Sequence, residues 1–126
     1  MERTYRLRGQ ADFQRTRQEG RCWSRRLMVL CIARNSLPYS RFGFSVSKRV
    51  GKATVRNRVR RRLREAVRHE RTAIAPGWDV VFLARPPIAA ATYAEIVASV
   101  RDLLRQAGLW LAGVGCESST LVGTGK

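Results

Sequence analysis

Residues Lys48–Arg71 read KRVGKATVRNRVRRRLREAVRHER, and this one segment combines an apolar repeat with a dense set of arginines. The apolar residues recur at steps of three and four, so they occupy one arc of an α-helix at about 100° per residue. We expect this arc to face a core and the helix to end near Arg71. The arc consists of Val55, Val59, Leu63, Ala66 and Val67.

The opposite arc of the same helix is almost wholly cationic. Like charges four residues apart destabilise an isolated helix by roughly 0.2–0.5 kcal/mol per pair. Solvated helix faces normally mix both signs, so the array favours a polyanion-binding surface over a merely solvated face. The outward set is Asn57, Arg60, Arg61, Arg64 and Arg68, with Arg58 and Arg62 towards one border and Arg56 at the edge of the apolar stripe.

The chain has 126 residues, a length that suits one domain. Its net charge of +16 indicates a basic surface that binds an acidic partner. The positive excess lies in the first 71 residues, which we expect to form the electrostatic footprint. The basic helix lacks the large apolar face of an interfacial helix, and no segment is apolar and long enough to span a bilayer. The first residues lack the apolar stretch of a secretory signal. We therefore expect a soluble, cytoplasmic protein without a membrane partner.

The cysteines are Cys22, Cys31 and Cys116, an odd number without metal-ligand spacing. This pattern indicates neither a disulfide framework nor a zinc site. We expect reduced thiols and no protein-bound metal.

The segments before the basic helix predict one helix and two strands. A helix is expected over Leu7–Gly20, with Phe13 as its large apolar anchor. Leu27–Ala33 reads LMVLCIA, the length of a buried strand, and Phe42–Val46 alternates apolar and small residues. A two-strand hairpin is the simplest way to join these two strands.

After the basic helix, the pattern predicts a strand over Trp78–Ala84 that ends at Pro86. Thr92–Glu95 matches a capping box at the start of a final helix that ends at Gly108. Residues 109–126 are rich in glycine and small polar residues, which is typical of a mobile tail.

A self-contained enzyme has little support in this sequence. His69 is the only histidine, and it lies near the end of the basic helix, where histidines commonly interact with terminal carbonyls. The carboxylates show no paired spacing for a two-metal nuclease, and there is no glycine-rich phosphate loop. If the protein belongs to an enzyme, we expect another component to carry the chemistry.

Gly51–Arg58 reads GKATVRNR, and Ser45–Arg49 just before it reads SVSKR. Here the chain resembles the bacterial ribonuclease P protein subunit, whose signature helix carries Arg-Asn-Arg after such a strand. The resemblance covers about residues 5–108. It extends to Asp12-Phe13, Gly20, Arg26, Asp79–Pro86 (DVVFLARP) and Thr92-Tyr93.

The resemblance implies an α+β fold: a single-domain α-β-β-β-α-β-α sandwich with a left-handed β-α-β crossover and helices packed on a mixed sheet. Residues 1–108 would form the RNA-binding domain. The pattern by itself gives three strands, and we place the fourth by a division within Tyr39–Ser47 and its neighbours.

The resemblance also implies a function. The protein would be the accessory subunit of a ribonucleoprotein endonuclease that removes the 5′ leader from precursor tRNA. The RNA subunit and its Mg²⁺ ions would perform the chemistry, so no catalytic residue and no cofactor are expected in the protein. The expected partners are the ribonuclease P RNA and the precursor tRNA leader. A ribosomal or general structured-RNA-binding protein is the alternative.

Two sets of site residues follow from the resemblance. The first would hold the catalytic RNA through phosphates, and comprises Lys48, Arg49, Lys52, Arg56, Asn57, Arg58, Arg60, Arg61, Arg64 and Arg68. The second would form the cleft for the single-stranded leader between the first helix and the sheet, and comprises Phe13, Arg17, Arg26, Val29 and Cys31.

The cleft residues depart from the family pattern in two places. Arg17 stands where relatives often carry a second aromatic residue, and Cys31 where the first strand often presents a tyrosine. We expect weaker base stacking and stronger phosphate contact, although arginine itself stacks on bases. Phe13 is equally well explained as a core anchor and as a cleft residue.

Overall fold

The computed structural model describes residues 10–70 and 73–110. Within them the helices and strands follow one another in the order α-β-β-β-α-β-α, with the 3-10 helix η3 before the last α-helix. This order confirms the expected α+β fold. The elements are α1 (Gln10–Glu19), β1 (Arg21–Ser24), β2 (Met28–Arg34), β3 (Arg41–Ser45), α2 (Ala53–Glu70), β4 (Trp78–Ala84), η3 (Pro86–Ala90) and α3 (Tyr93–Ala107).

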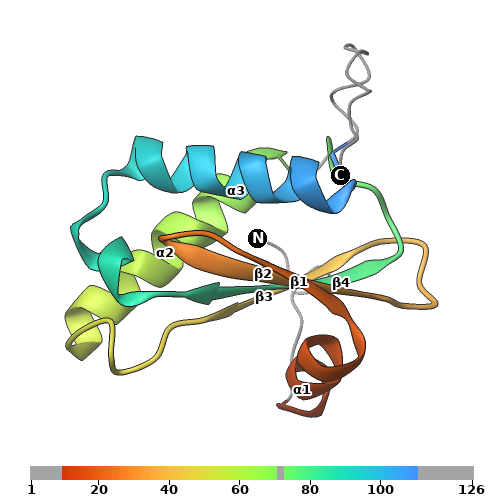
Figure 1. Ribbon diagram of the computed structural model, residues 1–126, viewed down its shortest axis with the longest axis horizontal. Coiled ribbons are helices and arrows are strands. Elements are labelled where there is room, and N and C mark those ends of the chain that lie inside the picture. The colour runs from red at the N-terminus through yellow and green to blue at the C-terminus, as the bar shows by residue number, and fades with distance from the viewer. Residues whose placement is uncertain (1–9, 71–72, 111–126) are drawn as a thin grey trace.

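The strands form one mixed sheet in the order β1-β2-β4-β3. β2 is antiparallel to both β1 and β4, whereas β3 runs parallel to β4. Parallel neighbours need a crossover connection, and α2 supplies it between β3 and β4. In Figure 1, α2 and α3 lie on one side of the sheet and α1 lies alone on the other.

Two expectations about the strands are wrong. The fourth strand is β1 and does not arise from a division of 39–47. β1 has only four residues, lies at the sheet edge and is mostly exposed, so it lacks the apolar run that marks a buried strand. The expected hairpin between the second and third strands is also absent, because β4 lies between β2 and β3.

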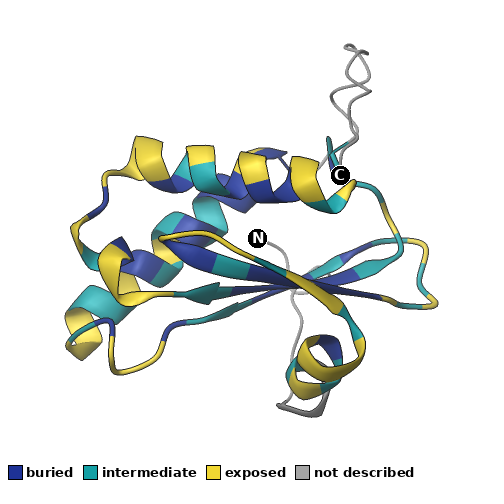
Figure 2. Cartoon of the chain, in the orientation of Figure 1, coloured by how far each residue is buried: buried dark blue, intermediate teal, exposed yellow. Residues whose placement is uncertain are grey.

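The core lies between the sheet and the two helices α2 and α3. Alternate strand residues point into it, including Leu30, Phe42 and Phe82. The predicted stripe of α2 is confirmed: Val59, Leu63, Ala66 and Val67 are buried, and Val55 packs against the core. Figure 2 shows that the buried sides of α2 and α3 face the sheet.

The final helix begins and ends as the sequence predicts. The side chain of Thr92 accepts a hydrogen bond from the backbone N–H of Glu95, and the Glu95 carboxylate accepts one from the Thr92 N–H, which completes the capping box. Gly108 has a φ of 79°, a conformation that glycine adopts without steric cost.

The packed chain continues past the expected boundary at 108. Leu109 is buried, and Trp110 forms an isolated β-bridge with Ile74. The tail mobility expected beyond them concerns residues 111–126, which lie outside the described residues, as do residues 7–9 of the expected first helix.

The expectation of reduced thiols at Cys22 and Cys31 is wrong, because the two form a disulfide. They are directly opposite each other in the β1–β2 pair. Neighbouring side chains at such a position come within bonding reach. Spacing in the sequence could not reveal this pairing, because it depends on β1, which the pattern did not reveal. Cys116 lies outside the described residues.

Candidate RNA interface

The outward face of α2 is predominantly basic. Its apolar stripe is buried, so the residues between the stripe positions point towards solvent. Asn57, Arg58, Arg61 and Arg68 are exposed, whereas Arg56, Arg60, Arg62 and Arg64 are partly buried. Asn57, Arg61 and Arg68 thus lie outward as predicted, whereas Arg60 and Arg64 are more buried than predicted and Arg58 is more exposed.

Several of these arginines are held by nearby oxygen atoms. Arg60 Nη1 donates to Asn57 Oδ1 over 3.0 Å, and Arg56 Nε donates to the Gly51 carbonyl over 3.1 Å. Arg58 donates to the carbonyl of Ala89 in η3 and Arg62 to that of Ala91 just after it, each over 3.3 Å. A carbonyl is neutral, so these contacts orient the guanidinium groups and leave their positive charge available to an anion.

Arg68 differs from the rest of the set. Its guanidinium binds both carboxylate oxygens of Glu65, with Nη2 and Oε2 2.7 Å apart. The hydrogen bonds and the charge attraction to Glu65 raise the pKa of Arg68. The hydrogen bonds from Arg68 and the positive charges of Arg68 and His69 lower the pKa of Glu65. Desolvation opposes both shifts but is outweighed. Both groups are charged at neutral pH and nearly cancel, so Arg68 adds less to the basic surface than the sequence suggested.

The lead-in to α2 is a tight turn. The Val50 N–H donates to the Ser47 carbonyl and the Gly51 N–H to the Lys48 carbonyl. Lys48, Arg49 and Lys52 are exposed around this turn, next to the positive end of the α2 dipole. Free N–H groups and cations together favour a phosphate there. Gly51 has a φ of 157°, and a Cβ on it would approach Val55 to 3.1 Å, so the turn favours glycine.

A groove lies beside α1 at the edge of the sheet that β3 forms. Its volume is about 440 Å³. One wall is α1, and the other is formed by the end of β3 and by α2, which contributes Arg60. Two arginines, Arg17 and Arg60, thus border a space that also has apolar walls. The lining residues are Phe13, Gln14, Arg17, Phe44, Ser45, Val46, Arg60 and Leu83.

Phe13 both packs on the sheet and lines this groove. A Cβ added to Gly43 would come within 2.6 Å of Phe13 Cζ, so the ring lies directly over that glycine. The ring remains partly exposed and borders the groove. The two explanations of Phe13 from the sequence are therefore compatible.

The other predicted cleft residues are placed differently. Val29 is partly buried and pairs with Leu83, so it lies one strand away from the groove lining. Arg26 is exposed in the turn between β1 and β2, and Cys31 is buried in the disulfide; neither is among the lining residues. Leu83 and Ser45 are groove residues that the sequence reasoning missed. The sequence could have indicated them, because Leu83 and Ser45 alternate with core-facing residues along β4 and β3 and therefore point to the other face of the sheet.

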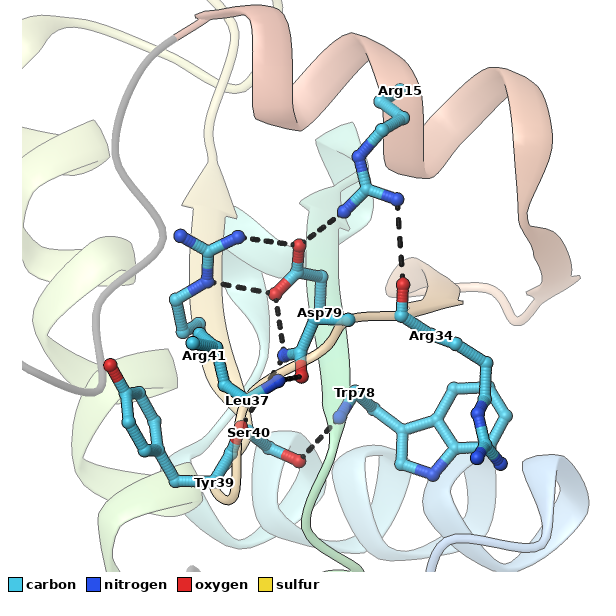
Figure 3. A network of polar contacts seen from close by, with 9 residues as sticks. Arg15, Arg34, Leu37, Tyr39, Ser40, Arg41, Trp78 and Asp79 are labelled. Atoms are coloured by element: carbon cyan, nitrogen blue, oxygen red, sulfur yellow. Dashed lines mark hydrogen bonds and ion pairs between the residues drawn. The ribbon is translucent and has the colours of Figure 1, made fainter.

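A buried carboxylate, Asp79 at the start of β4, connects α1 to the sheet (Figure 3). Arg41 on β3 binds both of its oxygens, with Nε–Oδ1 2.9 Å and Nη2–Oδ2 2.8 Å. Asn35 donates to Oδ1 over 2.9 Å. Arg15 on α1 donates to Oδ2 and, over 3.5 Å, to the Arg34 carbonyl. The carboxylate thus joins α1, β3, β4 and the chain after β2.

Burial alone would raise the pKa of Asp79, because it disfavours the charged form. The hydrogen bonds from Arg41 and Asn35 and the positive charges of Arg41 and Arg15 outweigh burial, so the pKa of Asp79 lies below its ordinary value. The group is a carboxylate at neutral pH, as the network requires.

Among residues 10–70 and 73–110, no three histidine, cysteine or acidic side chains gather as a metal site would require. None of the helices in these ranges has the length and apolar character that crossing a membrane would need.

The ribonuclease P protein family model matches residues 1–108, which is most of the chain. The chain belongs to the ribonuclease P protein family. Curated relatives agree with this assignment. The chain is 49% identical to the ribonuclease P protein component of Roseiflexus castenholzii over 110 residues, which is 86% of this chain and 90% of that protein. It is 44% identical to that of Herpetosiphon aurantiacus, covering 87% and 89% of the two chains.

Solved structures of this family share the fold. The chain resembles a Staphylococcus aureus RNase P protein structure with a TM-score of 0.79 at 32% identity, covering 84% of this chain and 97% of that one. A Thermotoga maritima RNase P protein gives a TM-score of 0.74 at 30% identity, covering 80% and 96%. A family member is the protein component of a ribonucleoprotein nuclease that processes tRNA, and such a component has an RNA subunit as partner.

Proposed function

We propose that this protein assists the catalytic RNA of ribonuclease P in removing the 5′ leader from precursor tRNA. The outward face of α2 and the turn before it bind the RNA subunit through phosphates, and the groove beside α1 receives the single-stranded leader. The observation that carries the proposal is that Arg60 belongs to the basic face of α2 and also lines the groove. One strand of RNA can leave the first surface and enter the second without crossing a neutral region.

The chemistry belongs to the RNA subunit and its Mg²⁺ ions, which hydrolyse the phosphodiester. The protein contributes binding and orientation. Arg17 and Arg60 neutralise leader phosphates, and the exposed part of the Phe13 ring offers a surface on which a base stacks. Added cationic contacts also reduce the Mg²⁺ concentration that the complex needs, because they offset repulsion between the two RNAs.

Reconstitution tests the proposal. Purified protein is mixed with ribonuclease P RNA at low Mg²⁺, and cleavage of precursor tRNA is followed over time. We expect clear stimulation over the RNA alone. A protein that binds this RNA and other structured RNAs equally well, without stimulating cleavage, would support the general RNA-binding alternative instead.

The α2 surface is tested by Arg61→Ala, since Arg61 is exposed on this face. Affinity for the RNA subunit should fall, and the slope of log affinity against log salt should decrease by about one unit, as for one lost phosphate contact. Arg105→Ala is the matched control because Arg105 is an exposed arginine of α3. An Arg61→Ala protein with the wild-type slope would remove Arg61 from the interface.

The groove is tested by Phe13→Ala. We expect weaker binding of leader-bearing precursor tRNA, by about 5- to 150-fold, with little change for mature tRNA, because stacking on one base contributes about 1–3 kcal/mol. An equal loss for both RNAs would indicate that Phe13 acts only in folding. Thermal unfolding of the variant measures that contribution separately.

A further inference from the structure

α1 has little apolar surface with which to hold its place. In Gln10–Glu19 the one large apolar residue is Phe13. By contrast, α3 buries Ile96, Val100, Leu103 and Leu104. Burial of apolar area is the main source of helix docking energy, so α1 needs a further attachment to the sheet.

The Arg15–Asp79 ion pair supplies such an attachment. Asp79 has no solvent-exposed surface, and Arg41 and Asn35 already give its two oxygens three hydrogen bonds. Arg15 is therefore not needed to satisfy the carboxylate. Its guanidinium adds a charged contact that runs from α1 to the interior of the sheet, and a second contact to the Arg34 carbonyl.

The position of this contact in α1 connects it to the groove. Phe13, Gln14 and Arg17 line the groove, and Arg15 lies between them in the same helical turns. The opposite wall, which includes Ser45 and Arg60, is fixed by β3 and by the apolar docking of α2. The width of the groove thus depends on where α1 sits on the sheet.

We infer that Arg15 and Asp79 are positioning residues, which hold α1 at the distance from the sheet at which the groove accepts a single RNA strand. This inference rests on the proposed function of the groove. Arg15 touches no RNA in this role; it acts through Phe13 and Arg17, which do.

Arg15→Met tests the inference, because it keeps an unbranched apolar stem, removes the guanidinium and leaves Asp79 paired with Arg41 and Asn35. In the reconstituted holoenzyme, we expect the affinity ratio between leader-bearing and mature tRNA to fall by about three- to tenfold. Affinity for the RNA subunit should stay within about twofold of the wild-type value. Arg15→Lys retains the charge and should recover part of the ratio, and Arg105→Met controls for the loss of one positive charge.

A second measurement is independent of RNA. Hydrogen exchange of the free protein should become faster in the α1 amides of Arg15→Met, while the amides of α2 and α3 keep their protection. Faster exchange with an unchanged leader ratio would overturn the positioning role and leave a purely structural contact. Unchanged exchange together with an unchanged ratio would overturn the inference entirely.

The two proposals fail in different ways. If the wild-type holoenzyme itself showed no preference for leader-bearing tRNA, the proposed role of the groove would be wrong. The inference that Arg15 positions α1 for a leader would then be wrong as well. The exchange measurement would then still report whether Arg15 holds α1. If the wild type showed the preference and Arg15→Met retained it in full, only the positioning inference would fall.

Discussion

α1 and α2 lie on opposite faces of the same sheet and are attached to it by different forces. α2 buries a stripe of valine, leucine and alanine, and two of its arginines, Arg58 and Arg62, add hydrogen bonds to backbone carbonyls at η3. α1 is attached through Phe13, which lies over a glycine, the fully buried Thr16, and Arg15, which reaches a buried carboxylate. Both helices contain arginines. Arg15 of α1 helps to attach its helix to the sheet, whereas most arginines of α2 lie on the side away from the core.

The contrast shows that the number of arginines in a helix does not tell which of them hold the helix in place and which remain available to a phosphate. An arginine opposite an apolar stripe is free to meet a phosphate, because the stripe already holds the helix in place. An arginine on a helix without a stripe is drawn into holding the helix. Arg61 illustrates the first case and Arg15 the second.

The largest expected effect is on the apolar attachment of α2. Leu63 is fully buried, and Leu63→Ala should lower the free energy of unfolding by about 2–5 kcal/mol through lost burial and the cavity left behind. Urea titration followed by circular dichroism measures the change. A loss below about 1 kcal/mol would mean that the stripe does not hold α2.

The next largest effect on stability is expected from the disulfide that joins β1 and β2. Cys22 and Cys31 are nine positions apart, and closing so short a loop stabilises a protein by about 2–3 kcal/mol in the chain-entropy model. Cys22→Ala should lower the urea midpoint accordingly, and dithiothreitol should lower the wild-type midpoint without affecting the variant. Equal wild-type midpoints with and without reductant would show that the bridge does not form.

A smaller and pH-dependent effect is expected at Asp79. The pKa of Asp79 in the folded protein is below its ordinary value, which is near 3.8. The ionised carboxylate therefore stabilises the fold fully at a pH above that ordinary value. This stabilisation is lost as the pH falls through the folded pKa. Asp79→Asn should lower the free energy of unfolding by about 1–2 kcal/mol at pH 7. The difference from wild type should shrink in acid. A difference that stays constant down to pH 2 would contradict the ionic role.

The smallest effect on stability is expected on the outer face of α2. Arg61→Ala should leave the free energy of unfolding unchanged or raise it, by no more than about 0.5 kcal/mol, since it removes like-charge repulsion and adds a strong helix former. The same urea titration tests this. A loss above about 1 kcal/mol would mean that Arg61 helps to hold the fold, and the contrast with Arg15 would disappear.

Patterns that repeat within one element predicted that element well. The stripe of α2, the apolar run of β4 and the capping box at Thr92 were all predicted and are all present. The pairing of the strands was not predicted correctly. Alternation in Phe42–Val46 says that a strand has two faces, but it does not say which strand lies beside it, and the true neighbour of β3 comes from beyond α2.

The candidate site divides in the same way. The basic face of α2 could be read from the sequence, because every residue in it belongs to one helix. The groove could not, because its walls come from α1, β3, β4 and α2, and sequence reasoning found only some of its residues. Arg26, Val29 and Cys31 were expected in the cleft, but they are not among its lining residues.

The sequence by itself determined the family, the arginine face of α2 and the order of most elements, because these depend on residues that are close along the chain. Only the tertiary structure decided that Cys22 meets Cys31, that Asp79 collects Arg15, Arg41 and Asn35, and that Arg60 belongs to two surfaces. The physical reason is that each of these contacts joins residues on different elements. Their distance is set by the register of the sheet and the packing of helices on its two faces, which no local periodicity encodes.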